Sequence, residues 1–286
     1  MTIHKGAVMN DGVRIHQTAV ISDSAQIHET AEIGPFAVIG PHVKIGSGTR
    51  IGAHCVIEGH TTIGSNCRIF VGATIGLEPQ DLKYKDEPTG VIVGDNVTIR
   101  EYVTIHRGTG DRFTTIGDDC FFMNYVHVAH DCRIGKGVVL ANNTTFAGHV
   151  VVGDYAVFSG FCILHQFARV GRGVMVGGMT GSRVDLPPFT LCDGRPASVR
   201  GINVIGLRRL KFPAEVRAAI KQAYKLIYRH GLNMSQATAR IEEELEPYPE
   251  VKEITEFFKD SKRGYAPAFT DGQEGTVTDE FPVDSI

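Results

Sequence analysis

The fold is decided by the stretch Ile33-Gly34-Pro35-Phe36-Ala37-Val38-Ile39-Gly40-Pro41-His42-Val43-Lys44-Ile45-Gly46, in which isoleucine returns every six residues. The spacing holds without a miss from Ile15 to Ile75, and glycine follows many of these isoleucines. Four residues after each one stands a position that is usually small, as at Ala37. A period of six fits neither a helix nor a hairpin meander, but it suits short strands with a turn after each. We therefore expect a β-helix in which isoleucines point inwards, small residues fill tight spaces and glycines relax the corners.

The repeat extends in both directions from this stretch. Backwards it reaches Ile3 and Met9, and forwards it is interrupted twice, near 77–92 and 106–115, by segments that we expect to be loops expelled from the β-helix. After the second interruption the spacing of six resumes with larger residues: Ile116, Phe122, Val128, Ile134, Leu140, Phe146, Val152, Phe158, Leu164, Val170 and Val176. Burying each is worth about 1.5–3 kcal/mol, so this core needs neither metal nor disulfide.

Composition narrows the class of protein. The net charge of −3 argues against nucleic-acid binding driven by bulk charge, and no segment approaches the roughly 20 apolar residues of a membrane span. Five of the six cysteines occupy the small interior position of the repeat, and Cys192 alone lies outside it. Packing explains them better than zinc or disulfides. We expect a cytoplasmic protein without a membrane span.

Composition also divides the chain. We expect a mainly β domain over 1–190, an α-helical C-terminal domain over 191–265, and a mobile tail over 266–286 that is acidic and has few anchors. Pro213 is predicted to open a first helix that ends at Gly231, Ser235 to cap a second, and Pro249 to start a third.

The candidate chemistry lies in the segment from His127 to Cys132. A histidine takes up a proton near neutral pH, and an adjacent carboxylate can fix its tautomer, so His130 beside Asp131 is the candidate base. If three hexapeptides make one triangular coil, the vertical repeat is eighteen residues, and His149 and His165 return to nearly the same column. These three histidines are then predicted to form a ladder on one edge, with His127 near the adjoining corner. The alternative is a set of idle polar residues on a solvated strand.

Longer motifs resemble the UDP-N-acetylglucosamine O-acyltransferases, the family that opens lipid A biosynthesis. The resemblance covers nearly the whole chain to about Ala266. Its motifs are Gln80-Asp81-Leu82-Lys83-Tyr84, Ile99-Arg100-Glu101, Val103-Thr104-Ile105-His106-Arg107-Gly108-Thr109, His127 to Cys132, Leu140-Ala141-Asn142-Asn143, Ala147-Gly148-His149-Val150, His165-Gln166-Phe167 and Met175-Val176-Gly177-Gly178. Together they are far more specific than the hexapeptide repeat, which many proteins share.

The resemblance implies a left-handed parallel β-helix, a homotrimer, and sites between neighbouring subunits. The reaction would move an R-3-hydroxyacyl chain from acyl carrier protein to the glucosamine 3-hydroxyl of UDP-N-acetylglucosamine. His130 matches the family's general base, Asp131 would orient it, and the Gly148 N–H matches the oxyanion donor. The positions that match substrate contacts are Asp81, Lys83, His127, His149, His165, Gln166, Asn203 and Arg209. No cofactor and no metal are implied.

One departure concerns the nucleotide. The family often has glutamate two residues after the asparagine that matches Asn203, whereas this chain has Ile205, which weakens the expectation for uracil. A basic set could meet the acidic carrier protein or could be a solvated helix face. Its members are Arg208, Arg209, Lys211, Lys221, Lys225 and Arg229.

Two other functions stay open at this point. A γ-type carbonic anhydrase uses the same solenoid and holds zinc with three histidines, for which His127, His130 and His149 are candidates, although that family lacks a helical C-terminal domain. A non-catalytic hexapeptide protein that binds a sugar nucleotide is the second. Whether the acceptor bears a 3-hydroxyl or a 3-amino group is also open, because both nucleophiles would use the same base.

The last expectation concerns chain length. Gly160 and Gly178 stand eighteen residues apart, so they stack in one column and leave a slot without side chains that can admit an acyl tail. Gly178 matches the position that acts as the hydrocarbon ruler in the family. The alternative is that both glycines serve tight corners.

Overall fold

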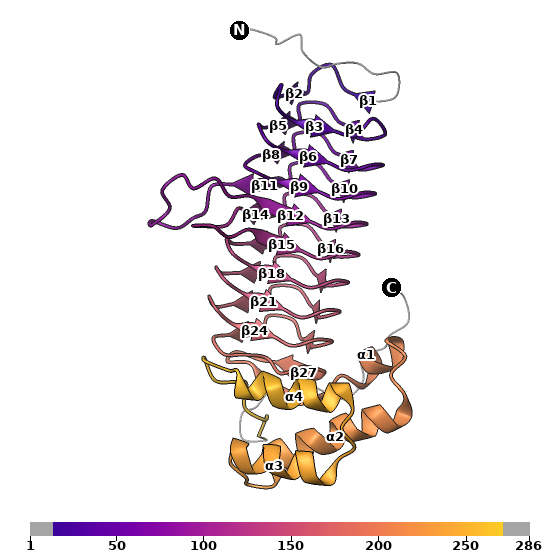
Figure 1. Ribbon diagram of the computed structural model, residues 1–286, viewed down its shortest axis with the longest axis vertical. Coiled ribbons are helices and arrows are strands. Elements are labelled where there is room, and N and C mark those ends of the chain that lie inside the picture. The colour runs from indigo at the N-terminus through magenta and orange to yellow at the C-terminus, as the bar shows by residue number, and fades with distance from the viewer. Residues whose placement is uncertain (1–13, 271–286) are drawn as a thin grey trace.

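The computed structural model describes residues 14–270, which form a long parallel β-solenoid with four helices at its C-terminal end (Figure 1). Ile3 and Met9, to which the repeat extends, lie outside the described residues, as do residues 271–286 of the expected tail. Within the described residues, no helix combines the length and the apolar character needed to cross a membrane.

Each coil is a triangle of three short strands, and stacking the coils produces three parallel sheets. Sheet A contains β1 (Arg14–Ile15), β4 (Glu32–Ile33), β7 (Arg50–Ile51), β10 (Arg68–Ile69), β13 (Thr98–Ile99), β16 (Phe121–Phe122), β19 (Val139–Leu140), β22 (Val157–Phe158), β25 (Met175–Val176), β27 (Thr190–Asp193) and β28 (Ser198–Ile202). Sheet B contains β2 (Val20–Ile21), β5 (Val38–Ile39), β8 (Val56–Ile57), β11 (Thr74–Leu77), β14 (Thr104–His106), β17 (His127–Val128), β20 (Thr145–Phe146), β23 (Ile163–Leu164) and β26 (Gly181–Ser182).

Sheet C contains β3 (Gln26–Ile27), β6 (Lys44–Ile45), β9 (Thr62–Ile63), β12 (Val91–Val93), β15 (Thr114–Ile116), β18 (Arg133–Ile134), β21 (Val151–Val152) and β24 (Arg169–Val170). The chain turns successively from A to B, from B to C and from C to A, and we call these turns the A–B, B–C and C–A corners. Among the strands of residues 14–270, only β28 runs antiparallel to its neighbour, and it closes the last coil.

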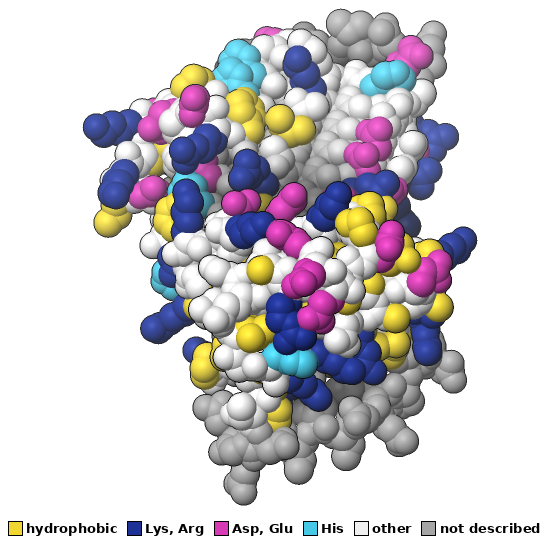
Figure 2. Space-filling view, turned by 60° about the horizontal axis from the view of Figure 1, so that its bottom comes forward, with side chains coloured by type: hydrophobic (Ala, Val, Ile, Leu, Met, Phe, Trp, Pro, Cys, Tyr) yellow, Lys and Arg dark blue, Asp and Glu magenta, His cyan; other side chains and the backbone are white. Residues whose placement is uncertain are grey.

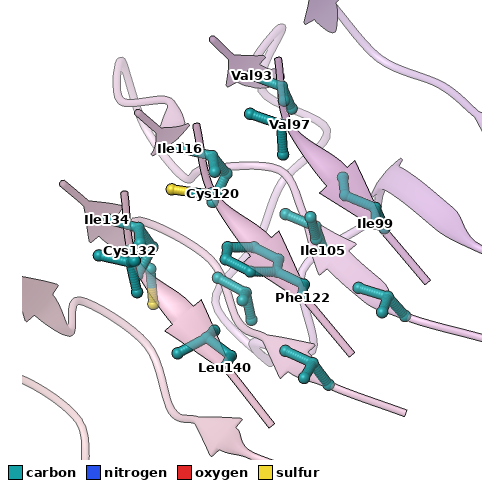
Figure 3. Packing of buried hydrophobic residues seen from close by; sticks show 14 of the residues in the cluster. Val93, Val97, Ile99, Ile105, Ile116, Cys120, Phe122, Cys132, Ile134 and Leu140 are labelled. Atoms are coloured by element: carbon teal, nitrogen blue, oxygen red, sulfur yellow. The ribbon is translucent and has the colours of Figure 1, made fainter. Parts of the chain in front are cut away.

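The interior confirms the expected pattern. Ile33 pairs with Ile51 and Ile51 with Ile69, so one aliphatic stacks on the next along each sheet. Figure 3 shows Val93, Ile116 and Ile134 in one such column. From Ala31 onwards the small positions are buried, and all six cysteines are free and buried, including Cys192 in the last coil. Side-chain packing between coils therefore holds the solenoid together.

The corners differ from the expectation for glycine. From Phe36 onwards, the left-handed residue of most corners stands three positions after the aliphatic and is mostly not glycine, as at Phe36, with φ of 58°, and Tyr125, with φ of 62°. Its cost, roughly 1–2 kcal/mol, is offset by a hydrogen bond from its N–H to the coil before, as from Tyr125 to Glu101. The glycine directly after the aliphatic is needed for close approach instead, because a Cβ at Gly46 would lie 2.6 Å from the backbone of Gly64.

Both loops leave the solenoid at the B–C corner. The first connects β11 to β12 and projects from the side of the solenoid, and the second connects β14 to β15 one coil later (Figure 1). The sequence between Leu77 and Val91 carries Asp81 and Lys83. The solenoid thus carries two extra segments at one edge, in adjacent coils.

The helices pack on the last coil. They are α1 (Val204–Arg209), α2 (Ala214–Arg229), α3 (Met234–Glu244) and α4 (Pro249–Lys259). Pro213 and Pro249 begin helices as expected, but the cap of α3 is Asn233 and not Ser235, since the Asn233 side chain accepts the Gln236 N–H and the Gln236 side chain returns to the Asn233 N–H. The helix α1 is an addition to the expected set.

The first residues of the expected tail are anchored to the solenoid. Ala266 is fully buried and pairs with Asp185, and the Phe269 N–H donates to the Val199 carbonyl. The Tyr228 hydroxyl also donates to the Ala266 carbonyl at 2.8 Å. The expectation of few anchors from Ala266 onwards was wrong for these residues, because the segment passes back along the end of the solenoid.

Candidate active site

The candidate base lies at the B–C corner, between β17 and β18. Asp131 takes the left-handed position there, with φ of 61°, and His149 takes it one coil later, with φ of 62°. The His149 N–H donates to the His130 carbonyl at 3.0 Å, so the solenoid itself stacks His149 over the His130–Asp131 pair.

His130 is oriented by its neighbour in sequence. Its Nδ1 lies 2.7 Å from Asp131 Oδ2, and because the carboxylate can only accept, Nδ1–H is the donor and Nε2 is the basic nitrogen. The His130 side chain is 13% exposed while that of Asp131 is 1% exposed, so the base reaches the surface and its partner does not. This geometry would suit a general base with its orienting group.

Asp131 stays ionised because of its donors. Burial alone would raise the pKa of its carboxyl, but hydrogen bonds from His130 and from the backbone and side chain of Thr109, with His149 nearby, outweigh burial and lower the pKa to about 2. The Thr109 N–H lies 3.0 Å from Oδ1, and the Thr109 hydroxyl lies 2.8 Å from Oδ2. Both carboxylate oxygens are therefore occupied, and the charge faces His130.

Gly148 is packed against the base. A Cβ at Gly148 would lie 2.6 Å from His130 Cε1 and 2.7 Å from His130 Nε2, so any larger residue would collide with the imidazole. Among residues 14–270, no acceptor takes the Gly148 N–H. The site thus combines a basic nitrogen with an adjacent free N–H donor.

The predicted histidine ladder is only partly present. The rings of His130 and His149 meet edge to face at 5.1 Å, and His149 Nε2 lies 3.5 Å from Asp131 Oδ2. The third member of the stack is Phe167, whose ring lies 4.5 Å from that of His149, and not His165. The reason is register, because His165 stands two residues before Phe167. The His165 side chain instead meets Arg263, with Nδ1 of the histidine 3.2 Å from Nη2 of the arginine. Burial lowers the pKa of His149, with Asp131 opposing and His130 adding to the shift.

His127 borders the same corner on the outer face of sheet B. Its Nδ1 lies 2.7 Å from Thr104 Oγ1, and its ring meets that of His106 edge to face at 5.4 Å. Burial lowers the pKa of His127 to about 4, and His106 adds to the shift. His127 is therefore neutral at neutral pH and suited to hydrogen bonding rather than to charge pairing.

The remaining sequence candidates divide into two groups. The first group lies near the His130 edge. Gln166 follows Gly148 one coil later at the B–C corner, and Asp81 is near enough to His149 to affect the pKa of that histidine. The Lys83 N–H donates to Asp81 Oδ1 at 3.0 Å. Gly178 lies at the A–B corner, and Asn203 and Arg209 lie in or beside α1 near the C–A corner, so a single chain does not place these three on the His130 edge.

Gly160 and Gly178 lie at A–B corners, but the backbone there does not require glycine. Neither has a left-handed φ, and a Cβ at Gly178 would meet only the Gly160 carbonyl at 3.7 Å and Ser159 at 3.9 Å. Phe161 and Met179 beside them are 60% and 75% exposed. The column is thus an open, apolar strip in which side chains would fit but are missing.

Asn203 has a structural task that the sequence did not reveal. Its Oδ1 accepts the Gly206 N–H at 2.9 Å, which caps α1, and its Nδ2 donates to the Gly173 carbonyl at 3.0 Å. Ile205, in the first turn of α1, is 51% exposed.

One group of side chains among the described residues has the spacing of metal ligands, namely His130, Asp131 and His149. It differs from the set His127, His130 and His149 that a carbonic anhydrase reading requires. The Asp131 oxygens already accept three hydrogen bonds, two from Thr109 and one from His130.

Thr109 is a functional candidate to which sequence reasoning gave no role. It lies in the second loop, twenty-two residues before Asp131, so no periodicity links the two. Its only signal was its place in the motif that ends at Thr109.

The comparisons with known proteins agree with this geometry. The family profile described as "Udp N-acetylglucosamine O-acyltransferase; Domain 2" matches residues 185–266, and the bacterial transferase hexapeptide profile matches 24–59, 42–77 and 113–148. A curated acyl-[acyl-carrier-protein]–UDP-N-acetylglucosamine O-acyltransferase of Burkholderia orbicola is 47% identical over 198 residues, which are 67% of this chain and 76% of the relative.

Solved structures extend the likeness over more of the chain. The UDP-N-acetylglucosamine acyltransferase from Campylobacter jejuni superposes with a TM-score of 0.85 at 39% identity, covering 90% of this chain and all of the other. That from Bacteroides fragilis gives 0.84 at 41% identity, covering 87% and 98%. With a shared solenoid, a shared helical domain and identity of this level, the chain belongs to the acyl-[acyl-carrier-protein]–UDP-N-acetylglucosamine O-acyltransferase family.

Proposed function

We propose that the chain transfers an R-3-hydroxyacyl group from acyl carrier protein to the glucosamine 3-hydroxyl of UDP-N-acetylglucosamine, the first step of lipid A biosynthesis, in the cytoplasm. The observation that carries this proposal is the His130–Asp131 contact of 2.7 Å with Gly148 against the imidazole. The names of the relatives supply the two substrates.

The chemistry follows from the protonation states. His130 Nε2 removes the proton of the acceptor hydroxyl as its oxygen attacks the thioester carbonyl, which is worth about 10²–10⁴ in rate. Asp131 stabilises the imidazolium that forms. The Gly148 N–H donates to the oxyanion, and the loss of one such donor typically costs about 2.7–4 kcal/mol. Collapse of the tetrahedral intermediate expels the carrier thiolate, which recovers the proton from His130.

The other candidates would bind the substrates. His127 and His149, both with lowered pKa values, would hydrogen-bond the sugar and its phosphates as neutral rings, and Asp81, Lys83, His165 and Gln166 border the same edge. Asn203 and Arg209 would contact the nucleotide. The Asn203 side chain already caps α1, so we expect it to contribute less to nucleotide binding than Arg209 does.

A homotrimer would complete the site. His130 lies at the B–C corner, whereas the Gly160–Gly178 strip lies at the A–B corner of the same chain. An acyl chain that starts at His130 reaches such a strip most directly if a neighbouring subunit places its A–B corner beside the B–C corner. Each of three subunits would then contribute one half to each of two sites.

The carrier protein would dock on the helical end. The side chains of the basic set Arg208, Arg209, Lys211, Lys221, Lys225 and Arg229 are exposed, and none forms an ion pair with another residue of 14–270. Figure 2 shows Lys and Arg side chains gathered at several places over this end, interspersed with Asp and Glu. Free cations there would steer an acidic carrier.

The function is tested by following release of the carrier thiol. We expect release from 3-hydroxyacyl carrier protein only when UDP-N-acetylglucosamine is present, and not with UDP-glucose, which lacks the acetamido group. Thiol release that does not depend on the sugar nucleotide would contradict acyl transfer.

Gly178→Met is expected to shift the donor preference to a shorter acyl chain. A Cβ at this position meets nothing closer than 3.7 Å, so we expect the variant to fold while its longer side chain shortens the strip. Short and long 3-hydroxyacyl carrier proteins are assayed in competition with both proteins. The matched control is Gly201→Met, where a Cβ meets nothing within 4 Å. An unchanged ratio in folded Gly178→Met would place the length limit elsewhere.

Activity is expected to persist after metal removal, because a base and an N–H donor suffice for this transfer. The protein is dialysed against a chelator, its residual metal is measured by mass spectrometry, and turnover is compared before and after. Stoichiometric zinc whose removal abolishes turnover would favour the metal site at His130, Asp131 and His149.

A further inference from the structure

The segment His106–Thr109 contacts both Asp131, which orients the candidate base, and Tyr84 of the first loop. It runs from His106, the last residue of β14, into the second loop, and its side chains reach Asp131 on one side and the first loop on the other. We propose that this segment is the positioning element of the site, in which Thr109 fixes the base through Asp131 and Arg107 fixes the loop that carries Asp81 and Lys83. The proposal rests on the proposed function, and neither residue needs to touch a substrate.

Thr109 holds the carboxylate from two directions. Its N–H donates to Oδ1 at 3.0 Å and its hydroxyl donates to Oδ2 at 2.8 Å, the same oxygen that accepts His130 Nδ1–H. The Asp131 N–H is held in turn by Thr114 Oγ1 at 2.9 Å. With the hydroxyl removed, Oδ2 keeps His130 as its only donor among these contacts, and the carboxylate is held less firmly although the Thr109 N–H still binds Oδ1. His130 would then lose part of its orientation.

The backbone of the second loop is tightly packed around this contact. A Cβ at Gly108 would lie 2.2 Å from the Arg112 carbonyl and 3.1 Å from Asp131 Oδ1, and the Gly108 carbonyl accepts the buried Thr89 hydroxyl. Thr89 ends the first loop. The backbone that presents Thr109 is therefore fixed between Asp131 and the other loop.

Arg107 holds the first loop through Tyr84. Its Nε donates to the Tyr84 hydroxyl at 2.8 Å, and its guanidinium lies over the Tyr84 ring at 5.4 Å. Nη1 lies 3.4 Å from the Gly76 carbonyl, and the side chain is only 14% exposed. Arg107 thus joins the start of the loop to its middle.

Tyr84 in turn shapes the stretch with the candidate contacts. Its N–H donates to the Asp81 carbonyl at 3.0 Å and closes the turn over 81–84, which contains Lys83. The Tyr84 hydroxyl also donates to the Glu87 carbonyl at 3.2 Å. Removing the Arg107 guanidinium would release this turn while leaving His130, Asp131 and Thr109 in place.

The two residues therefore predict different kinetic defects. Thr109→Val is expected to lower kcat about 10- to 100-fold, a part of what the base itself provides, with KM for UDP-N-acetylglucosamine within about twofold. Thr109→Ser keeps the hydroxyl and is expected to recover kcat to within about threefold. Arg107→Met is expected to raise that KM about tenfold with kcat at saturation within about twofold, because it removes binding rather than chemistry.

The experiment uses the full chain with 3-hydroxyacyl carrier protein and UDP-N-acetylglucosamine. Thermal unfolding is recorded for each variant. The matched control is Thr62→Val on the outer face of sheet C, where the threonine side chain hydrogen-bonds to no described residue. Full kcat in Thr109→Val, or a folded Thr109→Ser that is as slow as Thr109→Val, would overturn the role of the Thr109 hydroxyl. Arg107→Met with an unchanged KM would overturn the role of Arg107.

Failure here is distinguishable from failure of the proposed function. If His130→Ala is inactive while Thr109→Val is fully active, the base stands and only the positioning role is lost. If His130→Ala keeps its turnover, the base assignment itself is wrong.

Discussion

His130→Ala is expected to lower kcat by about 10²–10⁴, the range for removal of a positioned general base. The 2.7 Å contact with Asp131 occupies Nδ1–H and leaves Nε2 as the imidazole nitrogen that can accept a proton. The imidazole lies at a corner of the solenoid and is not part of its hydrophobic core, so its loss leaves the core packing in place. Steady-state kinetics with saturating donor and acceptor measure the effect.

The same variant must remain an intact protein for the result to bear on chemistry. We expect its sedimentation behaviour to match the wild type and its affinity for UDP-N-acetylglucosamine, measured by calorimetry, to change by less than about threefold. Turnover within about tenfold of the wild type would remove His130 from the role of base.

Gly148→Ala is expected to lower kcat about 10²-fold. The new Cβ would stand 2.6 Å from His130 Cε1, so the imidazole must move, and a misplacement of about 1 Å can cost this much. The N–H donor remains in the variant, so the loss reports the position of the base. The change is measured as kcat at saturating substrates.

The matched control for that substitution is Gly201→Ala. A Cβ there would meet nothing within 4 Å, and the residue lies in β28, away from the B–C corner. We expect its kcat to equal that of the wild type. If Gly148→Ala also keeps full activity, the close packing of Gly148 on His130 has no bearing on catalysis.

The solenoid was predictable because its information is periodic. A buried aliphatic at every sixth position, as at Ile33 and Ile39, specifies both the inward face and the length of each side. The role of glycine was harder to predict, because Gly46 is required by the backbone of the next coil and not by its own φ. A close approach between coils leaves no mark in local propensity.

The site was predictable where its parts are neighbours in sequence or one coil apart. His130 and Asp131 are adjacent, and His149 follows at nearly the vertical repeat, so counting residues brought them together. The same counting misplaced His165, because an offset of two residues turns the side chain from the corner to the face, and Phe167 takes the place on His149.

The hexapeptide repeat could not predict contacts that are made through loops. Thr109 meets Asp131 only because the second loop folds back on the B–C corner, and a loop that interrupts the spacing carries no register. The helix α1 has six residues, too few to show a helical period, and its signal was the Asn203 cap. Local hydrogen bonds, rather than hydrophobic pattern, decide both features.

The most direct test of the central claim is mass spectrometry of the product that the wild-type chain forms from UDP-N-acetylglucosamine and a mixed panel of acyl carrier proteins. The account predicts a UDP-sugar heavier by one 3-hydroxyacyl group, drawn from the longer members of the panel, with the link on the glucosamine 3-oxygen. Recovery of unmodified UDP-N-acetylglucosamine alongside bound but intact acyl carrier proteins would contradict it, since that result describes a protein that binds its ligands and transfers nothing.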